Sequence, residues 1–144
     1  MSPTFVGMRA LLMISIVYFN ATDTCAREIA VIVNKDVSVK VSNDQIVQIF
    51  MGRLKKLDDG SKVVPIGRNE KSDIYLIFNR KVLNRSNKQI KAYWSRMIFT
   101  GRDVPPRAIE TDADVLDLVA KNPNLIGYIE ASQINDSVKV IREL

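Results

Sequence analysis

From residue 27 onward the chain alternates between short β-branched runs and longer stretches with a helical period. The run at 29–34 has no internal polar residue, which is typical of a strand buried on both faces of a parallel sheet. Further strands are predicted at 62–66, 125–129 and 138–141, and residues 109–110 are extended at most. Because Pro65 cannot donate to a sheet ladder, we expect it at a sheet edge or a strand end.

Four helices are predicted between these strands, because each apolar stripe with a helical period follows a residue suited to an N-cap. The N-cap residues are Ser42, Ser72, Ser86 and Thr111, and the stripes contain Ile46, Ile49 and Phe50, then Ile74, Ile77 and Phe78, then Ile90, Tyr93, Trp94 and Met97, then Val115, Leu118 and Val119. Gln45 and Gln89 lie three residues after two of the serines, as in a capping box. Strands and helices alternate, so the predicted class is α/β, with a mainly parallel sheet flanked by helices.

Composition limits the chemistry that this fold could carry. The 144 residues suit one domain, and 47% hydrophobic with 26% charged residues is ordinary for a globular protein. The sequence has no histidine and one cysteine, which excludes His-based triads, zinc sites with His or paired Cys ligands, and an intrachain disulfide. Nothing pairs the remaining candidate bases, so we expect no enzyme, no metal and no cofactor.

The first 26 residues predict a secretory signal peptide. Arg9 precedes an uncharged apolar run at 10–19, and Thr24 and Ala26 suit a cleavage after Ala26. This mainly apolar run of ten residues is too short to span a bilayer stably. An uncleaved membrane anchor and a buried N-terminal helix are the alternatives, and translation could start at Met8 instead of Met1.

Cleavage after Ala26 would leave the domain 27–144 in the periplasm without Cys25, and therefore without a thiol. Lipidation of Cys25 is not expected, because residues 22–24 lack the Leu and the small Gly or Ala that the lipidation signal needs. The formal net charge is +5, from 21 Lys and Arg against 16 Asp and Glu. Nucleic acid is nevertheless a poor candidate partner for an exported chain.

Several short segments, in a fixed order, resemble one family. They are 29–34, Ile46 to Arg53, Asp59-Gly60 before Val64-Pro65-Ile66 and Arg68, Phe78 with Val82-Leu83, Trp94 with Phe99-Thr100-Gly101, and Asn122-Pro123 with Ile126 to Ile129. In order and spacing this set is similar to the phosphate-binding proteins of bacterial ABC importers, over about Ile29 to Val140. The resemblance implies a type II periplasmic binding protein fold and a solute-binding role in the transport of phosphate or a similar oxyanion.

The chain departs from that family in length. A full binding protein of the class has two lobes that close on the ligand, whereas the 118 residues from 27 to 144 supply about one. We therefore expect a single-lobe short form, either monomeric or a weak homodimer.

The second departure lies at the anion site. Family members place an arginine and then a Gly-Ser-Gly-Thr run where a strand leads into a helix, so that amides and hydroxyls meet the phosphate. Arg68 and Ser72 match, but Lys71, Asp73 and Ile74 replace the glycines and the threonine. A carboxylate about 4 Å from an anionic charge would cost on the order of 4 kcal/mol at an effective dielectric near 20, which Lys71 and Arg68 could partly offset.

The resemblance thus makes Arg68, Ser72 and Lys71 the predicted ligand-binding residues. Asn34 joins them because it follows the first strand, at the carboxyl edge where α/β sheets hold ligands. The alternatives are that Ser72 and Asp73 only cap a helix, and that Asn34 belongs to a solvated turn.

Two functions remain open on the sequence. One is solute binding, with phosphate or a similar small anion as ligand and an ABC permease as partner. The other is a periplasmic interaction or sensory module that has lost the ligand. The basic cluster Arg53, Lys55 and Lys56 could be solvated surface or could meet an acidic partner, and Trp94 could stack on a ligand or belong to the core.

Overall fold

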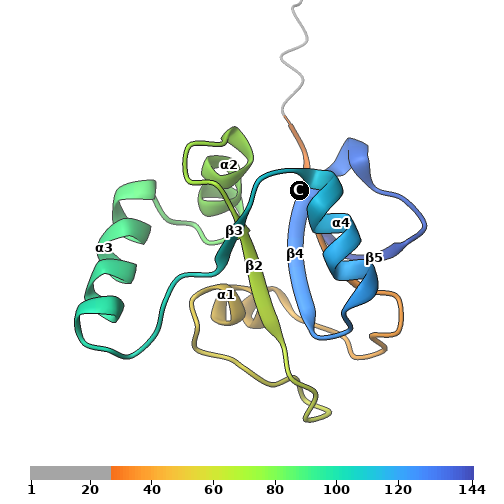
Figure 1. Cartoon of the computed structure of the whole chain (residues 1–144), viewed down its shortest axis with the longest axis horizontal. Coiled ribbons are helices and arrows are strands. Elements are labelled where there is room, and N and C mark those ends of the chain that lie inside the picture. The colour runs from red at the N-terminus through yellow and green to blue at the C-terminus, as the bar shows by residue number, and fades with distance from the viewer. Residues whose placement is uncertain (1–26) are drawn as a thin grey trace, which may run out of the picture.

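The structure is a computed structural model that describes residues 27–144, so the predicted signal peptide and Cys25 lie outside the described residues (Figure 1). Its elements are β1 (Ile29–Asn34), α1 (Asn43–Phe50), β2 (Val64–Arg68), α2 (Asp73–Lys81), α3 (Asn87–Phe99), β3 (Arg107–Ile109), α4 (Asp112–Lys121), β4 (Leu125–Glu130), a short 3₁₀ helix (Ala131–Gln133) and β5 (Val138–Glu143). The α/β class and the four predicted helices are confirmed. None of the helices in this part of the chain has the length and apolar composition needed to cross a bilayer.

The five strands form one sheet in the order β3-β2-β4-β1-β5. Strands β2, β3 and β4 are parallel, whereas β1 is antiparallel to both of its neighbours, β4 and β5. Four strands therefore share one direction, and the prediction of a mainly parallel sheet is confirmed. The prediction of parallel pairing for β1 is wrong, although its burial on both faces is as expected. A continuous apolar run indicates that a strand is buried on both faces, but burial does not determine whether the strand pairs in a parallel or an antiparallel direction.

Two hydrophobic clusters lie on opposite faces of the sheet. Because side chains alternate along a strand, Ile29, Val31 and Val33 contact the cluster that α1, α2 and α3 complete. Ala30 and Ile32 contact the cluster under α4. Figure 1 shows α3 at one end of the molecule, beyond the edge strand β3, and the buried residues of this 13-residue helix are Ile90 and Trp94.

Side-chain caps fix where the helices begin. Ser42 and Ser86 each form the predicted capping box with the glutamine three residues on. Ser72 and Thr111 each accept a hydrogen bond from the amide three residues on. Because a cap satisfies one of the free amides of the first turn, these boundaries could be predicted locally.

Gly127 in β4 allows α4 to pack close to the sheet. A Cβ at this position would lie 2.9 Å from Val115 Cγ1 and 3.0 Å from Ile66 Cγ1. On the other face of β4, Tyr128 stacks on Phe78 with ring centroids 3.7 Å apart. Strand β4 is thus clamped by α4 on one face and by aromatic rings on the other.

We expect Gly127→Ala to lower the free energy of unfolding by about 1–3 kcal/mol, because the added methyl group overpacks the contact between β4 and α4. Gly67→Ala is the matched control, since its Cβ would meet Pro106 at an ordinary 3.5 Å. Urea unfolding of both variants measures the difference. Equal stability of the two variants would show that the Val115 contact relaxes at no cost.

Candidate functional site

The carboxyl ends of β2, β3 and β4 meet at one edge of the sheet, where ligands bind in open α/β folds. The loop after β2 leads into α2, and the loop after β3 leads into α4. Arg68 is the last residue of β2, and Ser72 is the N-cap of α2. We call residues 68–73 and 110–112 the carboxyl-edge cluster.

Arg68 is buried, with 7% of its surface exposed, and its guanidinium is held by the chain itself. Nε donates to the carbonyl of Ile109 at 3.0 Å, and Nη2 donates to the carbonyl of Glu110 at 3.1 Å. Nη1 forms an ion pair with Asp112. All three nitrogens of the guanidinium therefore have a partner within the fold.

Asp112, in the first turn of α4, completes this arrangement, and its role was not predicted from the sequence. Its side chain is 18% exposed, and Oδ2 also accepts a hydrogen bond from the amide of Glu130 at 3.4 Å. Two local features of the sequence are consistent with this contact. An acidic residue follows the Thr111 cap, and the helix begins directly after an extended segment. The pairing itself depends on β3 lying beside β2, which a local pattern does not reveal.

Ser72 and Lys71 occupy the amino end of α2, as predicted. Ser72 Oγ donates to the carbonyl of Asn69 at 2.6 Å and accepts from the amide of Tyr75 at 3.4 Å. The amide of Lys71 donates to the side chain of Asn69, while the Lys71 side chain is exposed. Both residues lie in the same cluster as Arg68, and Ser72 already performs the capping role that was its alternative interpretation.

Carboxylates crowd this edge. Asp73 pairs with Arg27 at 3.2 Å, and Glu70 pairs with Lys91 at 3.5 Å. Glu110 accepts a hydrogen bond from the Asn69 side chain at 3.2 Å. An incoming dianion would therefore meet several negative charges, and the buried cation among them is already neutralised by Asp112.

Asn34 does not belong to this cluster, and the structure corrects its predicted place. Because β1 runs antiparallel to β4, the carboxyl end of β1 lies at the sheet edge opposite Arg68. Asn34 Nδ2 donates to the carbonyls of Val119 (3.0 Å) and Ala120 (2.8 Å) in the last turn of α4. Its side-chain oxygen accepts from the amide of Asp36 at 2.9 Å. Asn34 is thus a buried cap of α4.

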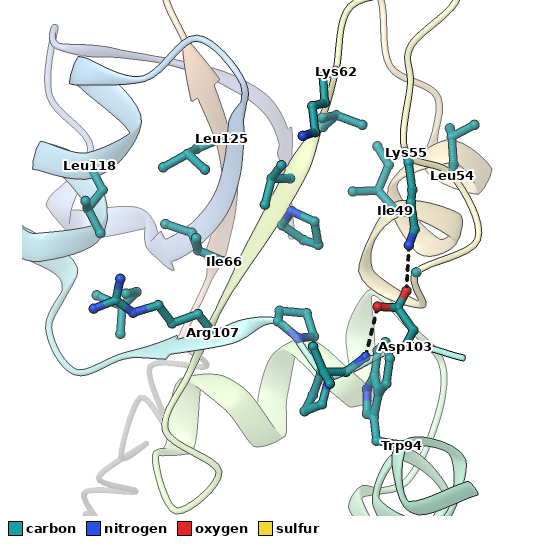
Figure 2. Close-up of a pocket in the computed structure, with 18 residues that line it drawn as sticks. Ile49, Leu54, Lys55, Lys62, Ile66, Trp94, Asp103, Arg107, Leu118 and Leu125 are labelled. Carbon is teal, nitrogen blue, oxygen red and sulfur yellow. Dashed lines mark hydrogen bonds and ion pairs between the residues drawn. The ribbon is translucent and has the colours of Figure 1, made fainter. Parts of the chain in front are cut away.

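A second feature lies toward the amino ends of the parallel strands: a groove of about 620 Å³ (Figure 2). Strand β3 pairs with β2 only from Ile66 onward, so Val64 and Pro65 have no strand beside them on that side in the described chain. Both residues line the groove, and Figure 2 shows Leu118 and Leu125 on one side of it and Ile49 and Leu54 on the other. Its lining is mainly apolar, and the sequence analysis did not predict it.

The wall of the groove formed by α1 and α3 is held by polar contacts. Lys55 pairs with Asp103 at 3.1 Å, as Figure 2 shows. The Tyr93 hydroxyl donates to the carbonyl of Met51 at 2.7 Å. Gly52 has a φ of +72°, a backbone conformation that favours glycine. A Cβ at this position would lie 2.6 Å from Asp103 Oδ2 and 3.3 Å from the Trp94 ring, so these two side chains leave no room for a larger residue.

Trp94 is 8% exposed and belongs to the core as well as to the groove lining. Beyond it, apolar side chains are exposed to solvent: Ile98 at 54%, Phe99 at 91% and Val104 at 67%. Val104 also lines the groove. We call the groove together with these three residues the apolar docking surface.

Within residues 27–144, no three acidic or thiol side chains are grouped so that they could hold a metal ion. Burial raises the pKa of Tyr128 above its ordinary value, as expected for a phenol stacked in the core. Hydrogen bonds from Ser61 lower the pKa of the Asp59 carboxyl, which lies in an exposed turn.

No family model matches the sequence. Among solved structures, the chain is similar to an ABC-type phosphate transport receptor from Vibrio cholerae (TM-score 0.62, 17% identity, 81% of this chain and 46% of that chain). A protein described as a phosphate ABC transporter substrate-binding protein from Clostridium perfringens, solved with bound phosphate, gives a TM-score of 0.63 at 22% identity, over 81% of this chain and 45% of that one. PstS from Borrelia burgdorferi gives 0.59 at 14% identity, over 80% and 47%.

The predicted resemblance is thus confirmed at the level of the fold. The chain spans a little under half the length of these solved proteins. It has the fold of part of a phosphate transport binding protein.

We expect Asp112→Asn to lower the free energy of unfolding by about 3 kcal/mol, because it leaves the buried Arg68 charge without its counter-ion. Asp117→Asn on the same helix removes an exposed ion pair with Lys121 and should cost less than about 1 kcal/mol. Denaturant unfolding of the two variants measures both effects. A small cost at Asp112 would mean that solvent already shields Arg68.

Proposed function

We propose that this chain is an exported, non-enzymatic binding-protein lobe that works through contact with another protein and retains no useful affinity for free phosphate. The observation that carries the proposal is the Arg68 guanidinium, whose three nitrogens are engaged by Ile109, Glu110 and Asp112. The similar structures support a binding role over catalysis, because the matched proteins are transport receptors and substrate-binding proteins.

The free-energy cost of binding an anion at Arg68 supports this interpretation of the carboxyl-edge cluster. For Arg68 to hold an anion, that anion would have to replace Asp112 or share the guanidinium with it. Replacing Asp112 would leave its carboxylate buried without its counter-ion, and sharing would place two anions side by side. Either route costs several kcal/mol, whereas an open phosphate site gains charge-assisted hydrogen bonds at no such cost.

Oxyanion binding at the amino end of α2 is the second candidate function. Within the described residues, the amides of Asp73 and Ile74 donate to no group, and helix amino ends attract anions. Lys71 and Ser72 would then be the primary contacts, with Arg68 behind them. The Clostridium perfringens protein, which was solved with bound phosphate, supports phosphate or a similar anion as the ligand of this candidate, and an ABC permease as its partner.

Titration calorimetry with inorganic phosphate separates the two candidates. We expect no saturable heat at millimolar phosphate for the natural chain, because its best-placed cation is already paired. Asp112→Asn should gain a weak heat, measured at a temperature where the variant is folded, while Asp117→Asn should not. Saturable heat in the natural chain that Lys71→Ala abolishes would establish the oxyanion function instead.

The exported state has its own test. We expect the protein recovered from the periplasmic fraction to begin at Arg27, as determined by mass spectrometry of the intact chain, because cleavage is predicted after Ala26. A product that keeps residues 1–26 in the membrane fraction would support the alternative of an uncleaved anchor.

A further inference from the structure

We propose that the apolar docking surface binds a segment of an acidic partner protein, in which apolar side chains alternate with or flank Asp and Glu. This inference rests on the proposed function, since it names the partner chemistry of an interaction module. Three features of the surface carry it: its apolar floor, its uncovered helix end and the sign of its charge.

The floor of the groove can receive apolar side chains. Val64 and Pro65 lie open where β3 does not reach, and Leu118, Leu125 and Ile49 flank them. A groove of about 620 Å³ is large enough for several side chains of a docked segment.

The apolar surface continues beyond the groove along α3. Ile98 lies four residues after Trp94, on the helix face that Ile90 and Trp94 bury against the core. The last turn of α3 extends past that core, so Ile98 and its neighbour Phe99 remain exposed. Exposed apolar side chains next to an apolar groove are typical of protein contact sites, and Ile98 and Phe99 add such side chains beyond the residues that line the groove.

The charge around the groove selects an acidic occupant. Lys55, Lys62 and Arg107 line it, whereas Asp103 alone among the described lining residues is acidic, and Lys55 neutralises it. Lys62 and Arg107 are exposed and have no ion-pair partner in residues 27–144. The carboxylates of the carboxyl-edge cluster lie at the opposite ends of the strands, and the lining of the groove carries a net positive charge, which favours an acidic partner.

The same charges disfavour a second copy of this chain as the occupant. Arg102 lies in the chain between Phe99 and Val104 and is exposed. The same segment carries Asp103, but Lys55 of the same copy already pairs with it. If Phe99 of one copy entered the groove of another, it would therefore bring a cation, Arg102, that has no ion-pair partner in residues 27–144. Like charges in such a contact oppose association, whereas Asp or Glu beside an apolar anchor would pair with them.

Selection from a phage-displayed library of random twelve-residue peptides on the purified protein tests the inference. We expect the enriched peptides to combine apolar residues with Asp or Glu. Trp94, the one tryptophan of the sequence, lines the groove, so its fluorescence should report titration of an enriched synthetic peptide. Binding should weaken roughly tenfold or more in the double variant Lys62→Glu with Arg107→Glu, and in Phe99→Ser.

Matched controls separate the surface from general charge and hydrophobicity. Lys40→Glu with Lys88→Glu makes the same charge change at exposed positions that do not line the groove, and Leu76→Ser removes an exposed apolar side chain on α2. Both should bind the peptide as the natural chain does.

The inference would be overturned by no enrichment, by enrichment without an acidic bias, or by equal binding of the charge-reversed variant. Self-association in sedimentation experiments that Phe99→Ser abolishes would also overturn it, in favour of a second copy. Saturable heat on titration with phosphate would contradict the proposed function but would not change the peptide result. Failure of the proposed function and failure of this inference are therefore distinguishable.

Discussion

The ion pair between Arg68 and Asp112 is the constraint on which the carboxyl edge of this fold depends. A guanidinium at the end of β2 is buried, and a buried cation is tolerated only if its charge and donors are satisfied. The carbonyls of β3 and its following loop, together with the first turn of α4, provide those partners, and Asp112 also accepts from the end of β4. The groups that join three strands and a helix at this edge are therefore the groups that engage Arg68, a predicted anion contact.

Charge is distributed unevenly across the two ends of the parallel strands. Carboxylates such as Glu70, Asp73 and Glu110 lie at the carboxyl edge, while Lys62 and Arg107 border the apolar groove toward the amino ends. A fold shared with phosphate transport proteins thus has its filled edge where an anion would be expected and its open, positively charged surface elsewhere. This contrast underlies the proposal that the chain contacts a protein and does not retain a free ion.

The position of most predicted site residues could be inferred from the sequence, but the pairing of Arg68 with Asp112 could not. Arg68, Lys71 and Ser72 lie in one cluster, because a strand leading directly into a capped helix fixes their neighbourhood locally. Asn34 was misplaced because its position depended on the direction of β1, which apolar composition does not encode. The groove was missed because it forms where β3 stops short of Val64, a matter of strand register between segments about forty residues apart.

The sequence by itself determined the four helices, their serine and threonine caps, the apolar stripes and the burial of β1, because these follow from interactions within a few residues of chain. The tertiary structure decided the antiparallel direction of β1, the partner of Arg68 and the uncovered end of α3. Each of these depends on which distant segments lie side by side. A charge or an apolar side chain has the same local pattern whether a neighbour covers it or leaves it free.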